Sequence, residues 1–329
     1  MTLLDVILYF VMPLAITALM TYGLIPYFHR KQFGQYIREE GPKAHLKKQG
    51  TPTMGGIAIF IGITAGMAIF MVRVSDPLKS WVSPHLVRDA VAIVLTMLAF
   101  GAIGFIDDFN KIAKKENLGL TAKQKLIMQA VFSIGLAFYM MRTGREDLFI
   151  PFLKIGVSFG FLYIPFVMFV EIAMSNAVNL TDGLDGLAAG VTAIVGITFA
   201  VIGWKGGDTI LTVSGTVVAG ALIGFLLFNH YPAKIFMGDT GSMALGGVLS
   251  GIAVVTGKEF LLPLVGLIYV LEALSVIIQV AYFRKTGGKR FFRMAPLHHH
   301  FELGGMKEYN VVYMFCAVTA VLGVIAYFG

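Results

Sequence analysis

RDAVAIVLTMLAFGAIGFIDDFN, residues 88–110, joins a long apolar run to a pair of adjacent aspartates. The run at 88–106 is close to the roughly 20 residues that an α-helix needs to cross the ~30 Å hydrocarbon core of a bilayer. Asp107 and Asp108 follow it directly. The segment therefore predicts a membrane-spanning helix that brings two carboxylates to the membrane surface.

Further apolar runs of similar length predict further spans at residues 3–27, 54–73, 122–141, 155–176, 186–203, 209–228, 242–256, 260–283 and 309–328. The composition agrees, because 57% of the 329 residues are hydrophobic and 14% are charged, whereas a soluble domain carries about 25% charged residues. We therefore expect an all-α integral membrane protein, a single domain over 1–329, with about ten transmembrane helices. Gly220 and Gly224, four residues apart, predict a close helix contact within the lipid.

Basic residues are distributed unevenly between the predicted loops. The loops on one side of the membrane hold 18 of the Lys and Arg residues, and the loops on the other side hold 8. Because basic residues concentrate in cytoplasmic loops, the first set is predicted to be cytoplasmic and both termini to lie outside. The same rule explains the net charge of +7, so we expect the lipid bilayer, and no nucleic acid, as a partner.

Five polar motifs lie in the predicted cytoplasmic loops. They are KQGTPTMGG (48–56), GFIDDFN (104–110), NAVNLTDGLDG (176–186), NHYPAKIFMGDTGS (229–242) and PLHHHFE (296–302). Because all five share one side of the membrane, they predict a single functional site at the cytoplasmic face.

These motifs are rich in carboxylates, namely Asp107, Asp108, Asp182, Asp185 and Asp239. Adjacent carboxylates at the end of an apolar helix repel one another and lose hydration, which a bound cation or a raised pKa relieves. A solvated helix end is the alternative for an isolated pair. Oxygen ligands suit Mg²⁺, which completes its coordination shell with phosphate oxygens and water. Zinc is less favoured, because no cysteine accompanies the histidines.

Other motif residues are suited to binding phosphate. Glycines in the turns, such as Gly183 and Gly238, let the backbone approach a ligand and expose N–H groups to it. The sequence has no P-loop pattern, so nucleotide hydrolysis is not predicted. Three consecutive histidines (298–300) beside Arg290 and Arg293 favour phosphate hydrogen bonding over a metal site or an ordinary polar loop.

Two groups of charged residues each admit two interpretations. Some lysines either neutralise a diphosphate or only follow the positive-inside rule, namely Lys48, Lys115, Lys123 and Lys125. Glu171 and Glu272 interrupt apolar helices, where a carboxylate usually has a function. Their distance in sequence from the motifs favours structural hydrogen bonding instead.

The segments GTPTMGG, GFIDDFNK, NLTDGLDGL, FMGDTGS and PLHHHFE together resemble the MraY family, the phospho-N-acetylmuramoyl-pentapeptide-transferases. This family belongs to the polyprenyl-phosphate N-acetylhexosamine-1-phosphate transferases, or glycosyltransferase 4 family. The resemblance implies transfer of phospho-MurNAc-pentapeptide from UDP-MurNAc-pentapeptide to undecaprenyl phosphate, with Mg²⁺, giving lipid I and UMP. It also implies peptidoglycan synthesis at the bacterial plasma membrane, ten helices and a homodimer.

The resemblance further implies roles for individual residues. Asp239 is expected to bind the metal, Asp107 and Asp108 to be catalytic and possible further ligands, and His298 to be catalytic. Residues expected to bind the substrates are Lys48, Thr53, Lys115, Lys123, Asn179, Asp182, Gly183, Leu184, Asp185, Asn229, Phe236, Ser242 and His299.

Two other functions are weighed against this one. A sister enzyme that transfers GlcNAc-1-phosphate to the same lipid would share the aspartate motifs, but PLHHHFE and GTPTMGG favour the muramoyl-peptide enzyme. An ion-coupled transporter is disfavoured, because transporters place polar groups near the midplane between repeats, whereas the polar motifs here share one face. The sequence leaves open whether the phosphoryl group is transferred in one step or through a covalent aspartyl intermediate.

Overall fold

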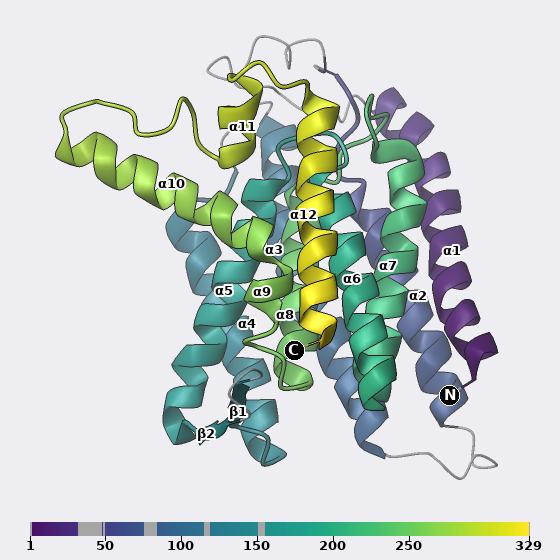
Figure 1. Cartoon of the computed structure of the whole chain (residues 1–329). Coiled ribbons are helices and arrows are strands. Elements are labelled where there is room, and N and C mark those ends of the chain that lie inside the picture. The colour runs from purple at the N-terminus through teal and green to yellow at the C-terminus, as the bar shows by residue number, and fades with distance from the viewer. Residues whose placement is uncertain are drawn as a thin grey trace.

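The computed structural model describes residues 2–31, 48, 50–75, 84–114, 119–150 and 155–328 and is shown in Figure 1. Ten of the described helices are long and apolar enough to cross a membrane. They are α1 (Leu3–Arg30), α2 (Gly56–Val74), α3 (Pro84–Lys114), α4 (Ala122–Arg142), α5 (Tyr163–Thr181), α6 (Leu187–Gly206), α7 (Thr209–Asn229), α8 (Gly238–Val255), α10 (Leu267–Lys285) and α12 (Glu308–Phe328). The predicted all-α membrane fold with ten spans is confirmed.

Shorter elements connect these spans, and two of them correct the predicted boundaries. Residues 155–158, predicted to begin the fifth span, instead form strand β2 (Ile155–Ser158), which pairs antiparallel with β1 (Asp147–Ile150). The 3₁₀ helix η2 (Gly160–Leu162) then leads into α5. The ninth predicted span breaks at Gly266 into α9 (Leu262–Val265) and α10, because Gly266 leaves the helical conformation.

Helix α10 leans away from the other spans, whereas α7 and α8 lie inside the bundle (Figure 1). Most residues of α7 and α8 are buried, whereas only a minority of the residues of α1 and α10 are. The short helix α11 (Leu297–Glu302) lies at one end of the bundle, and both chain ends lie toward the other (Figure 1). The spans alternate in direction, so the C-terminal ends of α3, α5 and α7 and the N-terminal end of α8 meet on the α11 side.

Helix α3 is longer than predicted, and this changes the setting of two aspartates. Its 31 residues extend about 46 Å at 1.5 Å per residue, more than the ~30 Å of the hydrocarbon core. Asp107 and Asp108 therefore lie on the helix itself and not in the following loop. This rigid backbone fixes their position.

Helix α7 packs closely against α1 at the two predicted glycines. A Cβ atom at Gly220 would lie 2.2 Å from the carbonyl oxygen of Phe10, and one at Gly224 would lie 2.3 Å from that of Leu14. Both distances are far below van der Waals contact, so the prediction of a close helix contact is confirmed.

Gly224→Ala should force α1 away from α7 and lower the melting temperature of the purified protein in detergent. Overpacking of this kind costs about 1–3 kcal/mol. The matched control is Gly23→Ala on α1, because a Cβ atom at Gly23 would meet nothing within 4 Å. The control should melt at or above the temperature of the parent protein, since alanine favours a helix over glycine. Equal melting temperatures for the two variants would contradict the close contact.

Candidate active site

Three carboxylates meet where α3 and α8 approach each other. Oxygen atoms of Asp107, Asp108 and Asp239 lie within 4.8 Å of one another. Gly104, one turn before Asp107, permits the approach, because a Cβ atom there would lie 2.0 Å from the carbonyl oxygen of Asp239. Asp107 and Asp108 are buried, so their mutual repulsion is weakly screened and must be offset by neighbouring groups.

Asp108 is bound to the first turn of α8. Its Oδ1 accepts a hydrogen bond from the backbone N–H of Asp239 (3.2 Å). Its Oδ2 accepts from the backbone N–H of Thr240 (2.8 Å) and from the Thr240 hydroxyl (2.6 Å). A carboxylate at a helix N-terminus satisfies free N–H groups and is stabilised by the helix dipole. Asp108 therefore joins α8 to α3.

Two lysines neutralise the other pair of carboxylates. Lys111 Nζ lies 2.6 Å from Asp107 Oδ2 and 3.2 Å from Asp239 Oδ2. Lys125 Nζ lies 3.1 Å from Asp107 Oδ1 and 2.7 Å from Asp239 Oδ2. Each lysine thus bridges the same two acids, which makes a compact cluster of alternating charge.

Of the other predicted lysines, Lys123 is exposed on the first turn of α4 and is not brought to this cluster. Lys115 lies outside the described residues. Lys111 was missed by the sequence analysis, although its place four residues after Asp107 on a helix was a usable signal.

The amide of Asn179, near the end of α5, completes the surroundings of Asp239. Its Nδ2 donates to Asp239 Oδ1 (3.1 Å) and to the hydroxyl of Ser242 (2.8 Å). Asp182 follows three residues later, and burial together with the negative charges of Asp239, Asp108 and Asp185 raises the pKa of its carboxyl well above the usual value. The site thus holds more negative charge than its lysines compensate, which favours the binding of a cation.

A second cluster joins Lys48, Asp185 and Glu308. Lys48 Nζ lies 2.6 Å from Asp185 Oδ1 and also pairs with Glu308. The second oxygen of Asp185 accepts from the backbone N–H of Ala233 (2.9 Å), and its own N–H donates to Glu308 (2.8 Å). The structure therefore brings the predicted Lys48 and Asp185 together and adds Glu308, the first residue of α12, which sequence reasoning missed.

His298 is buried between α10 and the turn that carries Gly183. Its backbone N–H donates to Glu272 Oε1 (3.2 Å), and its Nδ1 lies 3.2 Å from Glu272 Oε2. Its Nε2 faces Gly183 so closely that a Cβ atom on that glycine would lie 2.2 Å away. The hydrogen-bonding role expected of Glu272 is confirmed, but its partner is a motif residue. The same role expected of Glu171 is not confirmed, because both of its carboxylate oxygens are buried without a hydrogen-bond partner among the described residues. His299 instead pairs with Glu302 (2.9 Å).

Phe236 joins two of the motifs through its backbone. Its N–H donates to the carbonyl oxygen of Pro52 (2.8 Å), and its carbonyl oxygen accepts from the N–H of Gly55 (2.9 Å). The hydroxyl of Thr53 and the carboxylate of Asp108 both border Gly238, where a Cβ atom would lie 2.9 Å and 2.5 Å from them. Thr53 therefore lies beside the carboxylate cluster.

Two residues predicted to bind substrate, Asn229 and Leu184, are buried in the protein. Asn229 is 2% exposed, and its Nδ2 donates to the carbonyl oxygen of Ile235 (2.9 Å), so it braces the loop between α7 and α8. Leu184 is 4% exposed and belongs to the hydrophobic core. In the structure Asn229 therefore holds this loop in place, and Leu184 packs in the core.

The donor set of the cluster fits a magnesium ion. Asp107, Asp108 and Asp239 offer only carboxylate oxygens, which are the hard ligands that Mg²⁺ prefers. His298 is not one of these three residues, and its Nδ1 faces Glu272. A zinc site of nitrogen and sulfur ligands is therefore not formed by the described residues of the cluster.

Comparison with known proteins gives the family. A family model described as glycosyl transferase family 4 matches residues 90–257, and phospho-N-acetylmuramoyl-pentapeptide-transferase signature 1 matches residues 48–60. The phospho-N-acetylmuramoyl-pentapeptide-transferase of Clostridium botulinum (strain Alaska E43 / Type E3) is 47% identical over 303 residues, or 92% of this chain and 90% of the relative. The chain belongs to the phospho-N-acetylmuramoyl-pentapeptide-transferase family.

Other relatives agree with this membership. The phospho-N-acetylmuramoyl-pentapeptide-transferase of Halalkalibacterium halodurans is 46% identical over 98% of this chain and 96% of the relative. That of Listeria monocytogenes is 46% identical over 92% and 91%. The family signature covers the loop of Lys48 and Thr53, and the longer match covers the three clustered aspartates. Glu272, His298 and Glu308 lie beyond the end of that longer match.

Lys125→Met should lower kcat/KM by about 100-fold or more, as does removal of one charge-stabilising donor from other active sites. The reason is that Asp107 and Asp239 lose a shared cation. Lys123→Met is the matched control, because Lys123 is exposed two residues earlier on the same helix. Its kcat/KM should stay within about threefold of the parent value, as is usual for surface substitutions. Equal losses in the two variants would show that α4 contributes only general positive charge.

Glu272→Gln should lower kcat/KM at least tenfold, roughly the scale of a small misplacement of a reacting group, because it releases His298 from its fixed orientation. The loss should not add to that of His298→Ala, since both changes remove one contact. Glu171→Gln is the control: Glu171 is also buried, but it lies about 12 Å along α5 from Asn179. Glu171→Gln should leave kcat/KM close to the parent value, and additive losses at Glu272 and His298 would contradict the coupling.

Proposed function

We propose that this protein transfers phospho-MurNAc-pentapeptide from UDP-MurNAc-pentapeptide to undecaprenyl phosphate, giving lipid I and UMP. The observation that carries the proposal is the cluster of Asp107, Asp239, Lys111 and Lys125. It supplies alternating charge at one end of a membrane-spanning bundle, which suits a reaction between a lipid-linked phosphate and a soluble diphosphate. The names of the curated relatives support the same reaction.

The proposal includes a topology. We infer a single domain in the bacterial plasma membrane, with the carboxylate cluster at the cytoplasmic face and both termini outside, and a homodimer as the assembly. The uneven distribution of basic residues supports this orientation. A cytoplasmic site also gives a nucleotide-linked donor direct access from the water phase.

The reaction joins two anions. An oxygen of the acceptor phosphate attacks the β-phosphorus of the donor, a new P–O–P linkage forms, and the bond between that phosphorus and the bridging oxygen breaks to release UMP. A phosphate monoester has its second pKa near 6, so the acceptor is largely dianionic at neutral pH. The main task of the protein is therefore to offset repulsion and hold the two phosphates in line.

The residues divide this work. Lys111 and Lys125 offset charge on the reacting phosphates, and Asp107 positions the acceptor or takes its remaining proton. Lys48 and Asp185 belong to the donor side, together with Phe236, which is proposed to stack on uracil as aromatic side chains do on bases. Three hydrogen bonds already engage Asp108, which favours direct displacement over attack by this aspartate.

Asp239 would hold the magnesium ion, and Asp108 would stabilise the turn that presents Asp239. When bound, Mg²⁺ supplies positive charge to phosphate oxygens and to the leaving UMP. The excess of carboxylates over lysines supports a divalent cation at this position.

The decisive experiment incubates the purified protein with labelled donor and undecaprenyl phosphate. UDP-MurNAc-pentapeptide should give a lipid-linked product with release of UMP, and UDP-GlcNAc should give none. Product from UDP-GlcNAc alone would instead identify the sister enzyme. EDTA should abolish turnover and added Mg²⁺ should restore it. Asp239→Asn should lose nearly all activity even at saturating Mg²⁺, whereas substantial activity in this variant would contradict the proposed ligand.

A further inference from the structure

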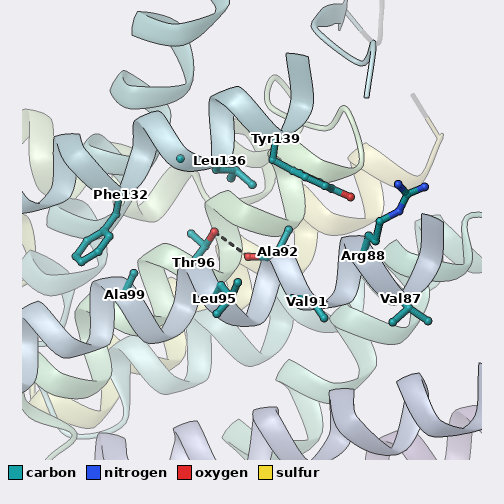
Figure 2. A pocket seen from close by; sticks show the side chains of 11 residues that line it. Val87, Arg88, Val91, Ala92, Leu95, Thr96, Ala99, Phe132, Leu136 and Tyr139 are labelled. Carbon is teal, nitrogen blue, oxygen red and sulfur yellow. Dashed lines mark hydrogen bonds between the residues drawn. The ribbon is translucent and has the colours of Figure 1, made fainter. Parts of the chain in front are cut away.

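An apolar pocket of about 570 Å³ opens between α3 and α4. Its nearer end, at Ala99, lies eight residues before Asp107 on α3, about 12 Å along the helix. Figure 2 shows its side chains, with Arg88 toward one end and Phe132 and Ala99 toward the other. Its lining extends along α3 from Val87 to Ala99, which is about 18 Å at 1.5 Å per residue. This length is close to one leaflet of a bilayer, half of the ~30 Å hydrocarbon core.

The polar groups inside the pocket are already satisfied by the protein. The hydroxyl of Thr96 donates to the carbonyl oxygen of Ala92 (3.0 Å), as Figure 2 shows. The hydroxyl of Tyr139 donates to Asp89 (2.6 Å). The interior of the pocket therefore offers an apolar surface to whatever occupies it, which suits a hydrocarbon chain and not a polar ligand.

Arg88 is the charged group at the mouth of the pocket. Its guanidinium is exposed and contacts the ring of His85 (2.8 Å). The neighbouring acid, Asp89, is held by Arg145 through two contacts of 2.6 Å and 2.9 Å. Within the described part of the chain no carboxylate pairs with Arg88, so most of its five N–H donors remain available for an anion.

We propose that this pocket is a binding site for an anionic phospholipid, whose acyl chain lies between α3 and α4 and whose phosphate contacts Arg88. The apolar lining is about as long as one leaflet is thick, and Arg88 lies at the end where a headgroup would lie. A zwitterionic lipid would fill the same space but would bring its own cation toward Arg88. Charge complementarity therefore selects a lipid with net negative charge.

The phosphate of the polyprenyl acceptor does not fit at the Arg88 end of the pocket. Arg88 and Asp107 are nineteen residues apart on α3, which separates them by about 28 Å along the helix. A lipid with its phosphate at Arg88 has its headgroup in the leaflet opposite the carboxylate cluster. The pocket is therefore separate from the site at which the acceptor phosphate reacts.

The glycine at position 135 is further evidence that the pocket holds a ligand. It lies in the middle of α4 and lines the pocket, and a Cβ atom there would meet no protein atom within 4 Å. Glycine weakens a helix interior, and no close helix contact at this position requires it. A small residue here leaves room for a chain that belongs to another molecule.

The test uses native mass spectrometry of the purified protein with phosphatidylglycerol or phosphatidylcholine of identical acyl chains. The parent protein should retain phosphatidylglycerol about fivefold more than phosphatidylcholine, the ratio that one basic residue gives near an anionic surface. Arg88→Gln should remove this preference, and Arg88→Lys should keep most of it. Arg142→Gln is the matched control. Arg142 is the last residue of α4 and is exposed, but it does not line the pocket.

A second variant tests the apolar part separately. Gly135→Leu should place a side chain in the pocket, because a Cβ atom at this position meets nothing within 4 Å. It should lower the retention of both lipids while leaving the melting temperature unchanged or higher. Excess inorganic phosphate should displace no lipid, because the chain and not the phosphate alone provides the binding. Equal retention of the two lipids by the parent protein would overturn the proposal. So would equal losses in Arg88→Gln and Arg142→Gln, or unchanged retention in Gly135→Leu.

Discussion

The hydrogen bonds from the first turn of α8 to Asp108 are the contact on which the rest of the site depends. They form only because Gly104 lets the backbones of α3 and α8 meet. Once α8 begins at this point, Asp239 must lie beside Asp107. The stabilisation of one carboxylate by helix amides thus places two further carboxylates in repulsive contact.

This repulsion gives the site its chemistry. Lys111 and Lys125 each bridge Asp107 and Asp239, and Asp182 nearby remains under the field of several acids. A site with surplus negative charge and two lysines suits a divalent cation together with phosphates. The lysines then have new anions to contact, and the acids have a cation. The charges that stabilise the protein without substrate are therefore the ones that suit the substrates.

Sequence patterns predicted local features well and distant pairings poorly. Hydropathy gave the ten spans, because each depends only on its own composition. Five motifs on one side predicted that Asp107 and Asp239 belong together. The pairing of Glu272 with His298 was not predictable, because the break at Gly266 redirects α10 and no local pattern reports that. The role of Glu308 was not predictable either, because its partners Lys48 and Asp185 come from distant parts of the chain.

Lys123 and Lys125 show the difference between what a count of charges predicts and what helical geometry predicts. A positive-inside rule counts Lys123 and Lys125 equally, since both lie on the predicted cytoplasmic side. Helical geometry does not, because residues two positions apart point to different faces. Lys125 reaches the acids and Lys123 faces outward. The orientation of the chain requires only a number of charges, whereas the site requires one particular face of α4. The same basic segment can therefore satisfy both requirements, with Lys125 in the cluster and the exposed Lys123 adding to the positive charge of the segment.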